Sequence, residues 1–303
     1  MILKLEAIFN YFIRRLTQVM QIIKLPVSIC IIFNNFRHRL ILKELSPYLH
    51  RSFIECNLKK FDNYADNSGI IWVFWWQGEQ SMPLIVRRCY ESIYRHSLNH
   101  QCVLITKYNV HKYAELPSYI YNKLNQGNIS FTHFSDILRF NLLSKYGGLW
   151  LDSTIFCVAD LTNKYFNNFY TANVGYDGYH FSVSLGKWTS FLIGGSKSNP
   201  FFRFMDLFFQ YYWKNNDISI DYFMMDYAIY YAYIHNIGNL KYCIDYDDYQ
   251  PNMFKLMNLM NQRFNLNIFN NIKANTQLFK LTYKKKIKNS NNSFFYMLFN
   301  SKL

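Results

Sequence analysis

Three charged side chains between residues 135 and 152 have spacings that suit a chemical role. Asp136 and Arg139 are three positions apart, so on a helix they lie on one face. Asp152 follows a short apolar run, and open α/β sheets place ligand-binding groups at the carboxyl ends of buried strands. The arginine fork matches the geometry of phosphate oxygens. Taken locally, the same residues also fit a helix-surface ion pair and a turn.

The elements that position these charges follow from the apolar pattern around them. Apolar side chains recur at helical spacing at Phe134, Ile137, Leu138, Leu142 and Leu143. This spacing predicts an amphipathic helix over 133–146, with Thr132 or Ser135 capping its start. Gly147 and Gly148 end the helix, and residues 149–151 are expected to form a short buried strand that ends at Asp152.

The complete pattern in this stretch is S-D-x-x-R-x-x-x-L-x-x-Y-G-G-x-x-x-D. It resembles the donor-site signature of sugar-nucleotide-dependent glycosyltransferases that carry a DXD motif. More narrowly, it is similar to the capsular polysaccharide synthesis branch, which is related to yeast mannosyltransferases and the large clostridial glucosylating toxins. Eight fixed positions within about twenty residues are hard to obtain by chance.

The resemblance implies roles for individual residues. Asp136 and Arg139 match the residues that hydrogen-bond the donor sugar and its phosphate, and the DXD motif corresponds to Asp152, Ser153 and Thr154. In the family this motif binds Mn²⁺ or Mg²⁺ beside the diphosphate, which would make Asp152 and Thr154 the metal ligands. A hydroxyl in place of the second carboxylate is a weaker ligand, so metal affinity should be lower than in a full DXD enzyme.

The apolar run 70–76 reads IIWVFWW and predicts the first buried strand. In the family, this strand carries an aromatic residue that stacks on the uracil ring of the donor, and Trp72, Trp75 and Trp76 are the candidates. Alternate residues of a strand face opposite sides, so Trp72 and Trp76 point one way and Trp75 the other. At least one of the three is expected to fill the core instead.

Two further segments resemble parts of the family site. The residues around Asp221 and Asp226 resemble a second acidic motif, and Asp226 lies among apolar neighbours, as a buried carboxylate of a site would. Asp221 equally fits a helix N-cap. Residues 278–284 resemble a lysine-containing segment close to the donor phosphates, with Lys280 or Lys284 near the diphosphate, although a solvated basic tail is the alternative. The predicted catalytic residues are therefore Asp136, Asp152 and Asp226, and the predicted donor-binding residues are Trp72, Trp75, Asp136, Arg139 and Lys280.

The chain of 303 residues is half hydrophobic and 20% aromatic, which is ample for a large core. The strand, helix and strand predicted over 70–106 favour a parallel sheet. We therefore expect an α/β fold, a GT-A-like Rossmann-type mixed sheet flanked by helices. The expected division is a basic amphipathic helical extension over 1–68, a glycosyltransferase domain over 69–285 and a basic tail over 286–303.

The formal charge of +14 is concentrated at the two ends. Residues 1–43 hold seven Lys or Arg and one Glu, and residues 280–303 hold six Lys and no acid. Such charge beside apolar residues favours an anionic membrane surface as a partner, while simple solubility is the alternative. Residues 1–43 would lie on the membrane or pack on the domain. Nucleic acid is not expected, because no nucleic-acid-binding motif accompanies the charge. The six cysteines have no metal or disulfide spacing and indicate buried thiols in the cytoplasm.

Together these features predict a glycosyltransferase of the hexosyltransferase type. It would move a sugar, with retention, from a nucleotide-diphosphate sugar, expected to be UDP-linked, to a glycan or lipid-linked saccharide. Its expected place is the inner face of the cell membrane. The alternative is a non-catalytic relative with a degenerate DXD site.

Overall fold

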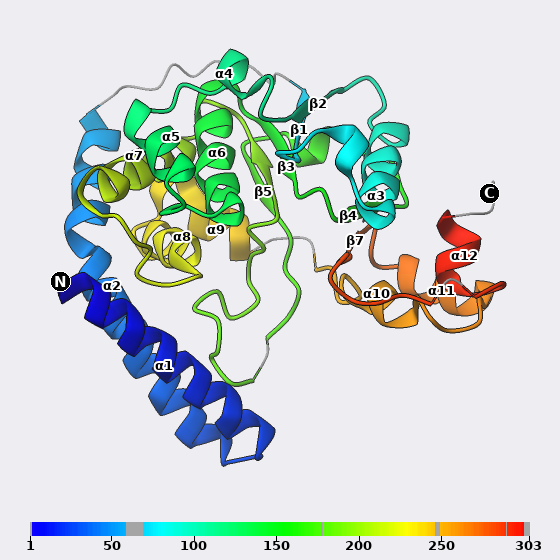
Figure 1. Cartoon of the computed structure of the whole chain (residues 1–303), viewed down its shortest axis with the longest axis horizontal. Helices are drawn as coiled ribbons and strands as arrows, with labels where there is room; N and C mark the ends of the chain where they lie inside the picture. Colours follow the sequence, from blue (N-terminus) through cyan, green and yellow to red (C-terminus); the bar gives the residue numbers. More distant parts are fainter. Residues whose placement is uncertain (1, 59–68, 177, 246–248, 289, 300–303) are drawn as a thin grey trace.

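The computed structural model describes residues 2–58, 69–176, 178–245, 249–288 and 290–299 (Figure 1). Its centre is a five-stranded mixed sheet in the order β2-β1-β3-β6-β5. The strands are β1 (Ile70–Phe74), β2 (Gln101–Ile105), β3 (Gly148–Leu151), β5 (Phe169–Thr171) and β6 (Leu192–Gly195). β1 is parallel to β2 and β3, whereas β6 runs antiparallel to both β3 and β5. The predicted mixed α/β sheet is confirmed.

Helices cover this sheet and extend beyond it (Figure 1). They are α3 (Leu84–Arg95), α4 (Val110–Tyr113), α5 (Ser118–Asn125), α6 (Phe131–Tyr146), α7 (Pro200–Asn215), α8 (Met224–Ile234), α9 (Leu240–Asp245), α10 (Lys255–Leu259), α11 (Leu266–Lys273) and α12 (Phe294–Phe299), with 3₁₀ turns η1 (Glu79–Ser81), η2 (Asn163–Tyr165) and η3 (Ile237–Asn239).

Strand β1 is apolar along its whole length because both of its faces are buried. Trp72 and Phe74 pack into the larger core, which includes residues of α6, α7 and α8. Ile71 and Val73 face the opposite way, into a second core with residues of β4 (Ile155–Cys157). The period of two along the strand thus separates the side chains into two cores.

Helix α6 begins two residues before the predicted start. Its N-cap is Ser130, whose side-chain oxygen accepts a hydrogen bond from the backbone N–H of His133. The prediction that Thr132 or Ser135 caps the helix is therefore wrong. The C-terminal end is as predicted, because Gly147 caps it at a φ of 67° that favours glycine.

A second, two-stranded sheet joins β4 to β7 (Leu278–Lys280) in antiparallel register. This pairing brings the C-terminal part of the chain beside the residues that follow β3. Beyond it, α12 buries Phe294, Phe295 and Phe299 against residues of α3 and α10. Part of the predicted basic tail, 286–303, therefore packs on the body of the protein.

The N-terminal region is a helical hairpin of α1 (Ile2–Ile22) and α2 (Val27–Leu58). The C-terminal half of α2 packs against α7, with Leu45 and Leu49 in the larger core. The free part of the hairpin projects away from the sheet (Figure 1). No helix among the described residues is both long and apolar enough to cross a membrane. Residues 59–68, predicted as the end of this extension, lie outside the described residues.

Gly148, at the start of β3, lies close against the backbone of β1 at Ile70. It adopts a φ of 100°, and an added Cβ would overlap the Ile70 carbonyl oxygen. We expect Gly148→Ala to lower the free energy of unfolding by about 3 kcal/mol or more, from left-handed strain and a backbone overlap together. Gly127→Ala is the matched control, because Gly127 has a φ of 80° with open space around it, and should cost about 1 kcal/mol. Urea denaturation measures both, and equal losses would contradict the overlap.

Candidate active site

A cavity of about 570 Å³ opens where β1, β3 and β7 end. Its size lies within the range of about 300–1,000 Å³ usual for small-molecule sites. Five segments line it: the end of β1 with the turn after it, the start of α6, the end of β3 with the turn after it, the chain before α8, and the end of β7 with the chain after it. The lining residues are Phe74, Trp75, Trp76, Gln77, Ser130, Phe131, Thr132, Ser135, Trp150, Asp152, Ser153, Thr154, Tyr222, Lys280, Leu281, Thr282, Tyr283 and Lys284.

Asp152 is the carboxylate at the centre of this cavity wall. One oxygen accepts a hydrogen bond from Lys280 Nζ at 2.6 Å, and the other accepts from Arg139 at 3.2 Å and from the Trp150 indole at 3.0 Å. Burial alone would raise the pKa of Asp152, but the Lys280 and Arg139 charges and these hydrogen bonds outweigh it. The pKa of Asp152 is therefore lowered, and the side chain stays ionised at neutral pH.

Arg139 joins the two predicted carboxylates. Its guanidinium lies 3.3 Å from Asp136 as well as 3.2 Å from Asp152, and only 3% of its side chain is exposed. The guanidinium also lies over the Trp150 ring, 5.0 Å from the centroid. Its Nε has no hydrogen-bond partner among the described residues. Asp136 and Arg139 thus form a buried ion pair beside the cavity, and the helix-surface alternative is wrong.

Aromatic side chains also line the cavity. Trp75 meets Tyr283 edge to face at 5.6 Å, and Trp76 lies 5.5 Å from the Phe131 ring. The indole Nε1 of Trp75 has no hydrogen-bond partner among the described residues. The cavity lining therefore combines aromatic rings with the ammonium groups of Lys280 and Lys284.

Trp72 does not belong to this aromatic group. It is 0% exposed in the larger core, and its indole donates to the Gly147 carbonyl oxygen at 2.9 Å. A ring with no accessible face cannot stack on a nucleobase, so the prediction of Trp72 as a donor-binding residue is wrong. The reason is its position in the middle of β1, where the sheet and α6 enclose it; Trp75 and Trp76 lie beyond the strand end.

Asp226 lies in the first turn of α8 and is mostly buried. Burial raises its pKa to about 7, against the opposing effect of a hydrogen bond from the Trp188 indole at 3.1 Å. The charges of Asp136 and Arg139 also act on it. Asp226 therefore belongs to the electrostatic cluster of the site and can exchange a proton near neutral pH.

Asp221 is not the N-cap of α8, because Phe223 occupies the N-cap position. The carboxylate of Asp221 instead accepts a hydrogen bond from the backbone N–H of Phe223.

The residues predicted to hold a divalent metal do not form a metal site on their own. Within the described ranges no group of three or more His, Cys, Asp or Glu side chains could hold a metal ion. Both oxygens of Asp152 already accept hydrogen bonds from cationic side chains. The Thr154 carbonyl oxygen is used by the Leu281 N–H. A cation bound by Asp152 and Thr154 would first have to displace the Lys280 ammonium, so the donor set is a poor fit to Mn²⁺ or Mg²⁺.

Several residues of the site were not among the predictions: Trp150, Trp188, Phe131, Tyr222 and Tyr283. Trp150 and Trp188 each donate an indole N–H to a predicted carboxylate. Trp150 is two residues before Asp152, a spacing that places both side chains on one face of an extended strand and could have suggested the contact. Nothing in the sequence near Asp226 points to Trp188, because the two are 38 positions apart.

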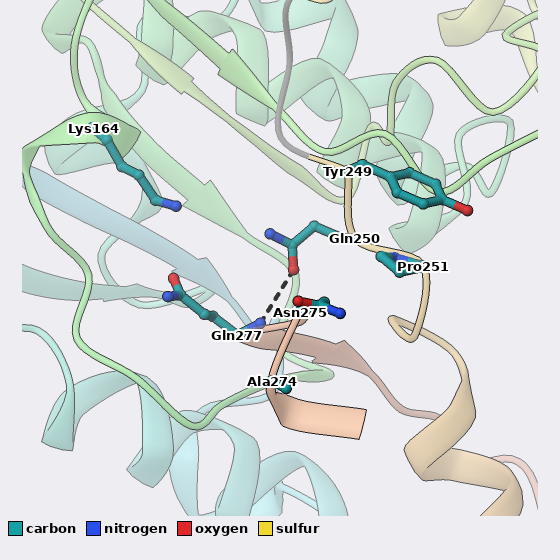
Figure 2. Close-up of a pocket in the computed structure, with 7 residues that line it drawn as sticks. All are labelled: Lys164, Tyr249, Gln250, Pro251, Ala274, Asn275 and Gln277. Carbon is teal, nitrogen blue, oxygen red and sulfur yellow. Dashed lines mark hydrogen bonds between the residues drawn. The ribbon is translucent and has the colours of Figure 1, made fainter. Parts of the chain in front are cut away.

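A second cavity, of about 430 Å³, lies near the other end of β7. Figure 2 shows the side chains of Lys164, Gln250 and Gln277 pointing toward one another across it, with Tyr249 at its edge. The Gln277 backbone N–H donates to the Gln250 side-chain oxygen at 3.1 Å. Its lining contains no carboxylate and none of the predicted site residues. The candidate active site is therefore the cavity around Asp152.

The pattern of the capsular polysaccharide synthesis protein family matches residues 22–298 of the 303. This chain belongs to that family. The match includes the whole cavity around Asp152, both sheets and all of α2. No curated protein and no solved structure matches the chain. Membership of the family points to a biosynthetic, glycosyltransferase-like role.

The raised pKa of Asp226 makes stability depend on pH. Because the pKa is 3.8 in the unfolded chain and about 7 in the folded one, folding disfavours the ionised form. We expect the free energy of unfolding of the wild type, relative to Asp226→Asn, to fall as pH rises from about 4 to about 7 and to stay constant above. Urea denaturation across this range measures the difference.

Asp245→Asn is the control with the opposite sign. Burial alone would raise the pKa of Asp245, but hydrogen bonds from Lys187 and Tyr233 outweigh it and the pKa is lowered. The stabilisation from Asp245 should therefore be present above pH 4 and be lost as pH falls below it. A pH-independent difference between wild type and Asp226→Asn over pH 4–7 would mean that Asp226 titrates as an ordinary exposed carboxyl.

Proposed function

We propose that this member of the capsular polysaccharide synthesis protein family is a glycosyltransferase. It takes a sugar from a nucleotide-diphosphate donor, UDP-linked by resemblance, and transfers it to a hydroxyl of a cell-surface glycan or lipid-linked saccharide. The observation that supports this best is the contact of Asp152, a carboxylate of the cavity wall, with two cations, Arg139 and Lys280, beside aromatic rings that also line the cavity.

Each part of a nucleotide sugar has a chemical counterpart in this cavity. The base stacks on an aromatic ring of the lining, Trp75 or Trp76, and such stacking tolerates any nucleobase. The diphosphate lies near the Lys280 and Lys284 ammonium groups, whose charges oppose its own. The sugar lies toward Asp152, the carboxylate of the lining, whose oxygens can accept hydrogen bonds from its hydroxyls. Asp136 and Asp226 belong to the same electrostatic cluster.

The reaction breaks the bond between the anomeric carbon and the diphosphate oxygen and forms a bond from that carbon to the acceptor oxygen. The acceptor hydroxyl loses its proton, and the nucleoside diphosphate leaves with the bonding electrons. Negative charge therefore grows on the diphosphate, where cationic side chains stabilise it. Asp226, with a pKa of about 7, is suited to take the proton. Retention at the anomeric carbon follows the resemblance to retaining enzymes.

Donor binding can be tested by thermal stabilisation with a panel of UDP-, GDP- and dTDP-sugars, with and without Mn²⁺. A donor that binds only the folded state at one hundred times its Kd stabilises by about 2.7 kcal/mol, which raises the melting temperature by several degrees. Because Lys280 is paired with Asp152, we expect this shift without added metal. Lys280→Met should lower donor affinity by about tenfold or more. Lys288→Met is the matched control outside the cavity. A shift that requires Mn²⁺ would contradict the assignment of the diphosphate to Lys280.

Transfer itself can be tested with two isosteric substitutions. Asp152→Asn and Asp136→Asn should each lower donor turnover by about 100-fold or more, because each removes a charge that orients Arg139. Asp160→Asn, an exposed carboxylate outside the cavity, should leave turnover unchanged. Release of nucleoside diphosphate, with and without saccharide acceptors, measures the rate. Donor binding without any turnover in the wild type would instead favour a non-catalytic nucleotide-sugar-binding protein.

A further inference from the structure

The exposed apolar side chains of α1 and the first half of α2 have no role in the site just described. The most exposed are Leu5, Ile8, Phe12, Ile22, Ile23 and Ile32, of which Ile22 is 78% exposed. We call these six residues the hairpin face. Soluble surfaces seldom expose so many large apolar side chains along one helical hairpin, and such a patch marks an interaction site.

The charge of the same region identifies its partner. Lys4, Arg15, Lys24 and Arg39 are exposed, and residues 1–43 contain a single acid, Glu6. Their net charge is +6, so two hairpins facing each other would repel. An anionic lipid surface offers apolar chains to the hairpin face and negative headgroups to the basic residues. The region has the composition of an interfacial helix, and neither α1 nor α2 can span a bilayer.

The body of the protein holds the hairpin in place. The Asn34 side chain donates to the Tyr179 carbonyl oxygen at 2.9 Å, and Arg37 donates to the Phe181 carbonyl oxygen. His38 contacts the His180 carbonyl oxygen at 2.8 Å and the Tyr227 hydroxyl at 2.9 Å. These buried contacts lie on the side of α2 that faces the body. The hairpin is thereby fixed as it projects from the sheet (Figure 1).

We propose that the hairpin face docks the protein on an anionic lipid bilayer, with both helices lying in the interface. On the cytoplasmic side this surface is the inner leaflet, which carries the negative lipids. A cavity of about 390 Å³ lies between α1 and residues 218–222, and Tyr222 lines both this cavity and the one around Asp152. Docking therefore places the mouth of the active site next to the lipid, where a saccharide carried on a lipid can reach it.

The test is flotation of the full-length protein with vesicles of phosphatidylcholine alone or with increasing phosphatidylglycerol, in the absence of donor and acceptor. We expect binding that grows with the anionic lipid and weakens with salt. Phe12→Glu and Ile32→Glu should each lower the affinity about tenfold or more, because they place a charge in the apolar contact. Arg15→Gln and Lys24→Gln should each lower it about fivefold, and only on anionic vesicles.

Leu266→Glu is the matched control, because Leu266 at the start of α11 is as exposed as Ile8 but lies outside the hairpin. It should bind vesicles like the wild type.

If a hairpin variant fails to fold, hydrogen exchange of the wild type answers the same question, since vesicles should slow the exchange of backbone amides around residues 22–29. No binding to anionic vesicles, or undiminished binding by Phe12→Glu and Ile32→Glu, would overturn the proposal. A dimer that Ile32→Glu dissociates would assign the face to a second copy. Because these measurements need no donor, they are independent of the proposed transfer reaction.

Discussion

The ion pairs of Asp152 with Arg139 and Lys280 are the interaction on which the site depends. The three residues come from the end of β3, the middle of α6 and the end of β7, so the contact joins segments that are 13 and 128 positions apart in the chain. Taking a charge out of water costs several kcal/mol, and removing one partner leaves another charge buried and unpaired. The order of the sheet, the β4–β7 pairing and the orientation of α6 must therefore all be correct together. The positive groups are in place before any ligand arrives, which is the condition for electrostatic stabilisation of a leaving diphosphate.

The sequence predicted the elements whose local pattern is strong. Strand β1 is a continuous apolar run, α6 has helical spacing closed by two glycines, and β2 follows at the distance of a parallel partner. It did not predict the β4–β7 sheet, because strands of three residues are too short to show a period. The cap of α6 was missed for a similar reason: Ser130, Thr132 and Ser135 are all suitable residues, and the choice depends on where the preceding turn leaves the chain.

The candidate site was predictable in its charges and less so in its aromatic residues. Asp136, Arg139, Asp152 and Lys280 lie together, as the resemblance implied, because motifs preserve the geometry that charge chemistry needs. For the three tryptophans, the period of a strand separates two faces but does not say where the strand ends. Trp72 lies in the core because β1 continues two residues past it. Trp75 and Trp76 follow Phe74, the last residue of β1 paired with β2, and their side chains line the cavity. Trp188 could not be found from sequence, since its contact with Asp226 depends on how the chain between β5 and β6 folds.

Under the proposed function, Thr154 stands where a DXD enzyme has its second carboxylate, which changes the charge balance of the site. The cavity lining holds one carboxylate, Asp152, and two ammonium groups, Lys280 and Lys284, so it carries a net positive charge before a donor binds. The Asp136–Arg139 ion pair beside the cavity adds no net charge. A diphosphate then competes with Asp152 for the Lys280 ammonium, because Lys280 is the less buried of the two cations that Asp152 contacts. If Lys280 turns to the phosphate, one oxygen of Asp152 is released toward the sugar while Arg139 keeps the other in place. Under the proposed function, a second carboxylate at position 154 would need a further cation beside it. The uncharged hydroxyl of Thr154 would instead let Lys280 alone serve both the empty and the occupied site.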